Sequence, residues 1–133
     1  MLPDLRALEL ASSAAPVTAV TFPTSLAELD AMAMPAVVLS LDGRILGLNL
    51  AALRIGGRQM DEIIGRYASE FAPGIEYLWD ERVTAGRQPD GGTFEIAIST
   101  RRSALMLEYI VKVCDFDGQP VVVALITRVQ PLP

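Results

Sequence analysis

The sequence contains no histidine. This absence removes the residue that most often serves as a general base, the usual protein ligand of haem and a common ligand of zinc. Only carboxylates remain as candidate metal ligands, and the acidic pairs Asp61-Glu62 and Asp80-Glu81, with Asp115 and Asp117, do not converge at a ligand spacing. The sequence therefore predicts neither a metal centre nor a haem site.

Cysteine and lysine each occur once, as Cys114 and Lys112. A single cysteine excludes an intrachain disulfide and is compatible with a reducing compartment. The formal net charge is -5 and no run of basic residues occurs, which argues against a nucleic-acid-binding surface. No apolar run approaches the roughly 18 residues of a membrane span, and the N-terminus lacks the basic region of a secretory signal. We therefore expect a cytoplasmic protein that contacts neither nucleic acid nor membrane.

Signatures of phosphate binding and of catalysis are also missing. Neither Gly-x-Gly-x-x-Gly nor the P-loop pattern occurs. Apart from Gly47, which lies within an expected strand, the glycines between residues 43 and 65 stand at expected turns and helix ends. The hydroxyl and thiol side chains have no evident basic partner, and Glu108 lies opposite the expected core face of its strand. We expect a protein that is not an enzyme.

What is present is enough apolar sequence for one domain of 133 residues, of which 51% are hydrophobic. Residues 1–24 are read as an N-terminal helix and linker, residues 25–130 as the domain, and residues 131–133 as a tail. "PDLRALELAS" is compatible with a flexible tail, and equally with a cap helix that docks on the domain or on a partner subunit.

The first half of the domain reads as a helix, a hairpin and further short helices. Ser25 and Glu28 form a capping-box pattern, and Pro35 ends the helix that follows. Strands are expected over residues 36–41 and 44–48, joined by the turn signal Asp42-Gly43. Asn49 is placed to cap the next helix, and "MDEIIG" and "YASEF" are expected to form short helices.

The second half reads as one longer helix followed by three strands. The helix is expected over residues 75–86, with an apolar face that includes Leu78, Trp79 and Val83. Alternation predicts strands over residues 93–100 and 105–116, and a second Asp-Gly turn precedes an apolar strand over residues 121–129. The fold class is α+β: a five-stranded antiparallel sheet with several short helices and one longer helix on one face, plus the N-terminal cap helix.

This order of elements resembles the PAS domain. "SLDGRILGLNLAA" is similar to the family's strand, Asp-Gly turn, strand and helix-starting Asn, and "DEIIGR" resembles its "Glu-Glu-Leu-Ile-Gly-Arg". "VTAGRQP" is similar to the end of the family's long helix, and "DFDGQPVVVALITRV" to its last hairpin and final strand. The resemblance covers residues 25–129 and implies a sensory and dimerising module of bacterial signalling or regulatory proteins.

Departures from the family pattern limit what the resemblance implies. Arg58 stands where the family usually has an aromatic residue, and Gln59 where it favours a capping Ser or Thr. The last strand reads Leu125-Ile126-Thr127, without the acid of the family's Asp-Ile-Thr ending, which puts the coupling to an output helix in doubt. The helix after Asn49 lacks the reactive cysteine of the flavin-binding branch, and the chain has no histidine that could bind haem. No cofactor is predicted, and an unknown small molecule is the candidate ligand.

The candidate ligand site is an apolar pocket between the sheet and the long helix. The alternative is that the same side chains simply fill the core. The expected lining is Val38, Leu53, Ile64, Phe71, Leu78, Trp79, Val83, Ile96, Ile98, Leu107, Tyr109 and Val111.

The outer face of the sheet is expected to carry an apolar patch that something must cover. We expect residues 1–24, a second copy of the chain, or both, and hence a homodimer. The expected patch is made of Met106, Ile110, Cys114, Val121, Val123 and Leu125.

The sequence thus predicts a sensory and dimerising PAS-type input domain of a signal-transduction or transcription-regulatory protein, whose effector domain lies outside these residues. The alternative is a protein-protein interaction module without a ligand. A third hypothesis is a small isomerase or cyclase with a cone-shaped fold, for which Tyr109 alone supplies too little chemistry.

Overall fold

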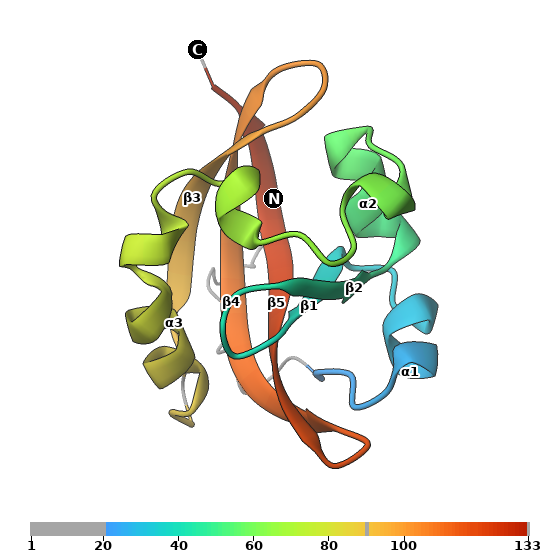
Figure 1. The fold of residues 1–133 in the computed structure, drawn as a ribbon, viewed down its shortest axis with the longest axis vertical. Helices are drawn as coiled ribbons and strands as arrows, with labels where there is room; N and C mark the ends of the chain where they lie inside the picture. Colours follow the sequence, from blue (N-terminus) through green and yellow to red (C-terminus); the bar gives the residue numbers. More distant parts are fainter. Residues whose placement is uncertain (1–20, 90, 133) are drawn as a thin grey trace, which may run out of the picture.

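The computed structural model describes residues 21–89 and 91–132. The helix expected in "PDLRALELAS" therefore lies outside the described residues. The elements, in chain order, are α1 (Leu26–Ala31), β1 (Ala36–Leu39), β2 (Ile45–Leu48), α2 (Leu50–Gly56), η2 (Met60–Glu62), η3 (Ala68–Glu70), η4 (Ile75–Tyr77), α3 (Trp79–Gly86), β3 (Thr93–Ser99), β4 (Ala104–Phe116) and β5 (Gln119–Pro131) (Figure 1).

All five strands form one antiparallel sheet in the order β2-β1-β5-β4-β3. The two long strands β4 and β5 form a hairpin whose turn is Asp117-Gly118, and both turn residues have positive φ (53° and 85°), as a type I′ turn requires. β1 is hydrogen-bonded to β5, so the N-terminal hairpin joins the C-terminal hairpin side by side. The α+β class and the five-stranded antiparallel sheet predicted from the sequence are confirmed.

The inner face of the sheet is covered by the chain from α2 to α3, which crosses in front of the strands in Figure 1. β5 presents Val122 and Ala124 to this face, and these side chains belong to a core cluster with Leu39, Leu48 and Val111. Strand alternation places the neighbours of Val122 and Ala124 on the opposite face.

The outer face is covered by α1 and the residues on either side of it. Leu29, 1% exposed, packs in one cluster with Ile110, Val121, Val123 and Leu125 of the sheet. Phe22, Met32, Met34 and Cys114 pack against this cluster. The apolar patch expected to be covered by residues 1–24 or by a second chain is thus largely covered by residues 22–34 of the same chain.

Met106 lies at the other end of the outer face, which is polar. Its neighbours across the sheet are Ala97 and Gln130, and close by Arg128 forms salt bridges of 3.2 Å with both Glu95 and Glu108. None of the helices in residues 21–89 and 91–132 covers this end, and charged side chains stand here in place of apolar ones. The homodimer stays a prediction, and its interface would have to use side chains other than the buried ones of the expected patch.

Asn49 ties the two layers together. Its amide oxygen accepts hydrogen bonds from the backbone N–H groups of Ala52 and Ala36, at 3.0 and 3.1 Å. Its Nδ2 donates to the backbone carbonyl of Met34 at 2.8 Å, and also lies within 3.4 Å of the carbonyls of Leu29 and Met32. The cap predicted at Asn49 is confirmed, and the same side chain also fixes the segment that joins α1 to β1.

The longer helix is shorter than the sequence predicts. In place of one helix over residues 75–86, η4 and α3 are separated at Leu78, whose φ and ψ are -111° and -2°. Beyond the break, the indole Nε1 of Trp79 donates a hydrogen bond of 2.7 Å to the carbonyl of Leu41 in the β1–β2 loop. Because Leu41 is distant in sequence, the residues around Leu78 contain no local pattern that predicts the break.

Candidate functional site

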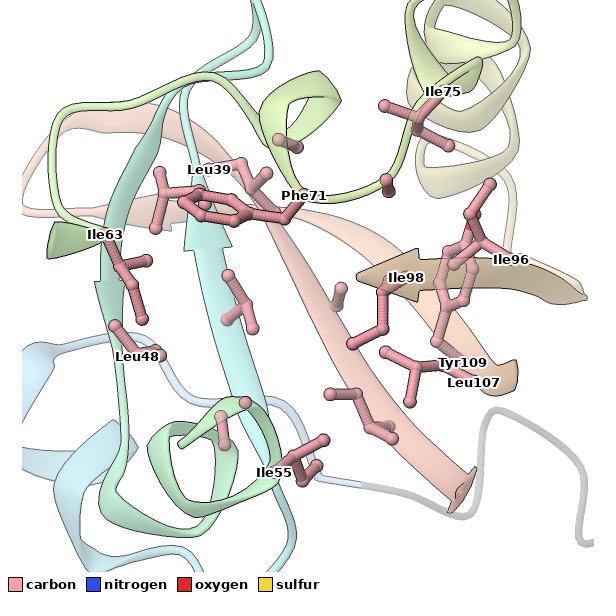
Figure 2. Close-up of a pocket in the computed structure, with 18 of the residues that line it drawn as sticks. Leu39, Leu48, Ile55, Ile63, Phe71, Ile75, Ile96, Ile98, Leu107 and Tyr109 are labelled. Atoms are coloured by element: carbon pink, nitrogen blue, oxygen red, sulfur yellow. The ribbon is translucent and has the colours of Figure 1, made fainter. Parts of the chain in front are cut away.

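A cavity of about 180 Å³ lies between the inner face of the sheet and the chain from α2 to α3. Figure 2 shows side chains converging on it from the strands and from the helical side. An engineered cavity of about 150 Å³ with a similar apolar lining stays dry and binds benzene. The space is therefore large enough for a small apolar molecule.

The structure divides the twelve side chains expected to line the pocket. Those that line the cavity are Phe71, Trp79, Ile96, Ile98, Leu107, Tyr109 and Val111. Those that do not are Val38, Leu53, Ile64, Leu78 and Val83. The ones that line it come mainly from β3 and β4, where strict alternation of apolar and polar residues shows which face is buried.

Physical reasons explain why two of these side chains do not line the cavity. Val38 points to the outer face and packs in the cluster of Leu29, because Val37 and Leu39 on either side of it face the cavity. Ile64 is 38% exposed, since the single turn of η2 turns Ile63 inward instead.

Three further side chains of the expected lining are absent from the cavity wall. Leu53 and Val83 are half-buried and pack against the inner core cluster, and Leu78 stands at the break between η4 and α3. α2 lines the cavity with Ala52 and Ile55 instead of Leu53. The remaining contributors that the sequence analysis missed include Leu39, Ile45, Leu48, Ile75, Val122, Ala124 and Ile126.

A buried arginine stands beside the cavity, and the sequence analysis did not identify it. Arg82 of α3 is 8% exposed, its Nε donates a hydrogen bond of 3.0 Å to the Tyr109 hydroxyl, and its guanidinium carbon lies 4.0 Å from the ring centroid of Phe94. A signal was available: Arg82 follows Trp79 by three residues and so shares its helical face. Because arginine is charged, the sequence pattern alone predicts that Arg82 is exposed to solvent.

The chemistry available at Tyr109 is limited. Burial raises the pKa of the Tyr109 hydroxyl, and the neighbouring Arg82 guanidinium offsets this only in part. A phenol held neutral well above physiological pH is a hydrogen-bonding group and not a general base. Tyr109 and Arg82 therefore position α3 against β4 at the cavity wall.

Arg58 supplies the charge at the cavity wall. Among the described residues it is the one charged side chain in the lining, and its guanidinium carbon lies 5.1 Å from the ring centroid of Phe71. Its Nε is buried and has no hydrogen-bond partner among the described residues. Buried donors are nearly always paired, so this one requires an explanation.

Other chemistry finds no support in the part of the chain that the structure describes. That part contains no group of three or more His, Cys, Asp or Glu side chains placed to hold a metal ion. Burial raises the pKa of the Cys114 thiol, which lowers its fraction of reactive thiolate. No helix in the described residues is long and apolar enough to cross a membrane.

Comparison with known proteins identifies the family. The family model of the PAS fold matches residues 29–129, most of the chain. The chain belongs to the PAS-fold family. No curated protein matches it significantly. The fold is also similar to that of solved PAS domains.

Three solved structures illustrate the likeness. The PAS domain of an HTR-like protein from Haloarcula marismortui is 20% identical, with 76% of this chain and 85% of that chain covered and a TM-score of 0.62. The PAS domain of nitrogen regulation protein NR(II) from Vibrio parahaemolyticus is 16% identical, with 82% and 99% covered and a TM-score of 0.58.

A domain of a sensory box sensor histidine kinase/response regulator from Geobacter sulfurreducens is 18% identical, with 77% and 90% covered and a TM-score of 0.60. At these identities the likeness shows the fold alone. PAS domains are generally sensory, non-catalytic modules. Of these neighbours, one is a domain of a sensor histidine kinase/response regulator and another is a domain of a nitrogen regulation protein.

Proposed function

We propose that this PAS-fold domain is a sensory input module that binds a small apolar ligand in the cavity between the sheet and the helical layer. The observation that carries the proposal is the cavity of about 180 Å³, which the apolar side chains around it leave unfilled. Protein interiors are close-packed, and an unfilled cavity forfeits dispersion contacts with its lining. A ligand of matching size would restore those contacts.

The position of the cavity suggests how occupancy would be transmitted. β5 lines it through Val122, Ala124 and Ile126, and the helical side lines it through Phe71 and Ile75. A ligand that touches both layers stabilises the conformation in which the distance between the sheet and the helical layer matches the size of the ligand. Binding would therefore shift the population of states in which β5 and the helical layer are held in that arrangement.

The test is binding of neutral apolar probes, followed by melting temperature and native mass spectrometry. We expect 1-octanol or indole to raise the melting temperature, because a ligand at about 100 times its Kd adds about 2.7 kcal/mol to the free energy of unfolding. Ala124→Leu should reduce the shift, because the larger side chain takes up part of the cavity. The matched control is Ala97→Leu, the same change on an exposed position of β3.

A melting-temperature rise that persists unchanged in Ala124→Leu would place the binding elsewhere and contradict the proposal. The absence of any rise with neutral or charged apolar probes would favour the alternative of an interaction module without a ligand.

A further inference from the structure

The buried Nε of Arg58 is the starting point. Arg58 contributes to the wall of a cavity that is otherwise lined almost entirely by hydrocarbon, and this nitrogen has no hydrogen-bond partner among the described residues. A guanidinium presents N–H donors in a planar fork that fits a carboxylate. Arg58 therefore combines an unpaired donor with a place in the cavity wall.

The backbone around Arg58 holds the side chain there. Gly57 ends α2 in the left-handed conformation (φ 67°), and the chain then turns toward η2. The guanidinium carbon of Arg58 lies 5.1 Å from the centroid of Phe71, which also lines the cavity. Stacking of this kind restricts the conformations of a long side chain. Ligand binding would therefore cost little further side-chain entropy at Arg58.

Further positive charge gathers at this end of the cavity. The backbone N–H of Arg101, in the β3–β4 turn, donates to the carbonyl of Gly56 at 3.3 Å, so the turn reaches the end of α2. The guanidinium of Arg102 comes within 3.1 Å of the place that a Cβ on Gly57 would take. The nearby carboxylate of Glu62 is already engaged by Arg101 and by the backbone N–H of Gln59. In a chain of net charge -5, this end favours an anion.

We propose that the cavity takes a monocarboxylic acid with a hydrocarbon tail of medium length, whose carboxylate binds Arg58 and whose tail lies among Phe71, Ile98 and Leu107. This rests on the proposed function, because it names the chemical class of that ligand. A single guanidinium suits a monoanion, whereas a phosphate dianion would require more donors than the described lining offers. The carboxylate would accept hydrogen bonds from the Arg58 guanidinium and balance its charge.

The experiment compares octanoate with 1-octanol, two ligands of one chain length that differ in their charge. Titration calorimetry on the full chain is expected to show octanoate binding at least about tenfold more tightly than 1-octanol, since charge-assisted hydrogen bonds are roughly twice as strong as neutral ones. In Arg58→Gln the octanoate affinity should fall about tenfold, with 1-octanol unchanged. The control Arg54→Gln removes an exposed charge from α2 and should change neither affinity.

Each outcome decides the proposal. Equal binding of the two ligands, or an octanoate affinity that Arg58→Gln leaves intact, overturns the carboxylic-acid class while the apolar-ligand function stands. Failure of octanoate, 1-octanol and indole alike overturns both. If Arg58→Gln does not fold, Arg58→Lys replaces it, and there a retained charge without the planar fork should still weaken octanoate selectively.

Discussion

Arg82 and Tyr109 are joined across 3.0 Å by a hydrogen bond from the guanidinium Nε to the phenol oxygen, and both residues are buried. The same guanidinium lies over the ring of Phe94. A buried cation is costly unless neighbouring groups compensate it, and a desolvated cation–π contact contributes about 2 kcal/mol or more. The bond therefore holds α3 against β3 and β4, next to the cavity wall.

Tyr109→Phe should lower the free energy of unfolding by about 1–3 kcal/mol, because it removes the acceptor and leaves the Arg82 donor buried. Urea denaturation at neutral pH measures the loss. Tyr77→Phe, at a side chain that is 85% exposed, is the control and should leave stability within about 0.5 kcal/mol of the wild type. Equal effects of the two changes would show that the hydrogen bond contributes nothing measurable.

The same residue predicts a loss of stability in alkali. The folded-state pKa of Tyr109 is raised above the ordinary value of 10.0, because burial disfavours the phenolate. The folded protein therefore holds this proton more tightly than the unfolded chain. The resulting stability is fully present below about pH 10 and is lost as the pH rises through the folded-state pKa.

Urea midpoints at increasing pH, for the wild type and for Tyr109→Phe, test this sign. The advantage of the wild type should be constant up to about pH 9 and should shrink above about pH 10. An advantage that grows with pH would mean that the Arg82 cation outweighs burial and lowers the pKa of Tyr109.

Local signals predicted much of this fold. The strands follow from alternation along β3 and β4, both Asp-Gly turns from their residue types, and the start of α2 from Asn49. Each of these depends on residues within a few positions of one another. The PAS resemblance then follows from the order of these elements along the chain, whereas the order of the strands within the sheet comes from the structure.

Features that depend on distant residues were not predictable in this way. The break at Leu78 accompanies a hydrogen bond from Trp79 to Leu41, and the inward side chain of Arg82 depends on Tyr109 and Phe94. A cavity in particular is the small difference between the volume that the fold encloses and the volume that the side chains occupy. The periodicity of apolar residues in the sequence carries no information about this difference.

Asn49→Ala should be among the most destabilising changes on the chain, by about 3 kcal/mol or more. It leaves the N–H groups of Ala36 and Ala52 without their acceptor, and it also removes the donor to the Met34 carbonyl. Asn49→Asp keeps the acceptor for the two N–H groups, but it places a carboxylate oxygen against the carbonyl oxygen of Met34. Because the two oxygens repel each other, this variant should also be less stable than the wild type.

The comparison for Asn49 is Ser25→Ala, which removes the partly exposed N-cap of α1 and should cost only about 0.5–1 kcal/mol. Urea denaturation of the three variants separates the two roles. A loss for Asn49→Ala no larger than that for Ser25→Ala would mean that Asn49 caps α2 and does nothing more.

Gly86 and Gly56 offer a matched pair, because each is the last residue of its helix. A Cβ on Gly86 would lie 3.1 Å from the backbone nitrogen of Val113 in β4, whereas a Cβ on Gly56 would meet no atom within 4 Å. Gly86→Ala should therefore push α3 away from the sheet and destabilise by about 1–3 kcal/mol. Gly56→Ala should stabilise by up to about 1 kcal/mol through helix propensity. If Gly86→Ala instead gains stability as Gly56→Ala does, the contact between α3 and β4 is looser than the structure shows, and the cavity wall formed by α3 is free to move.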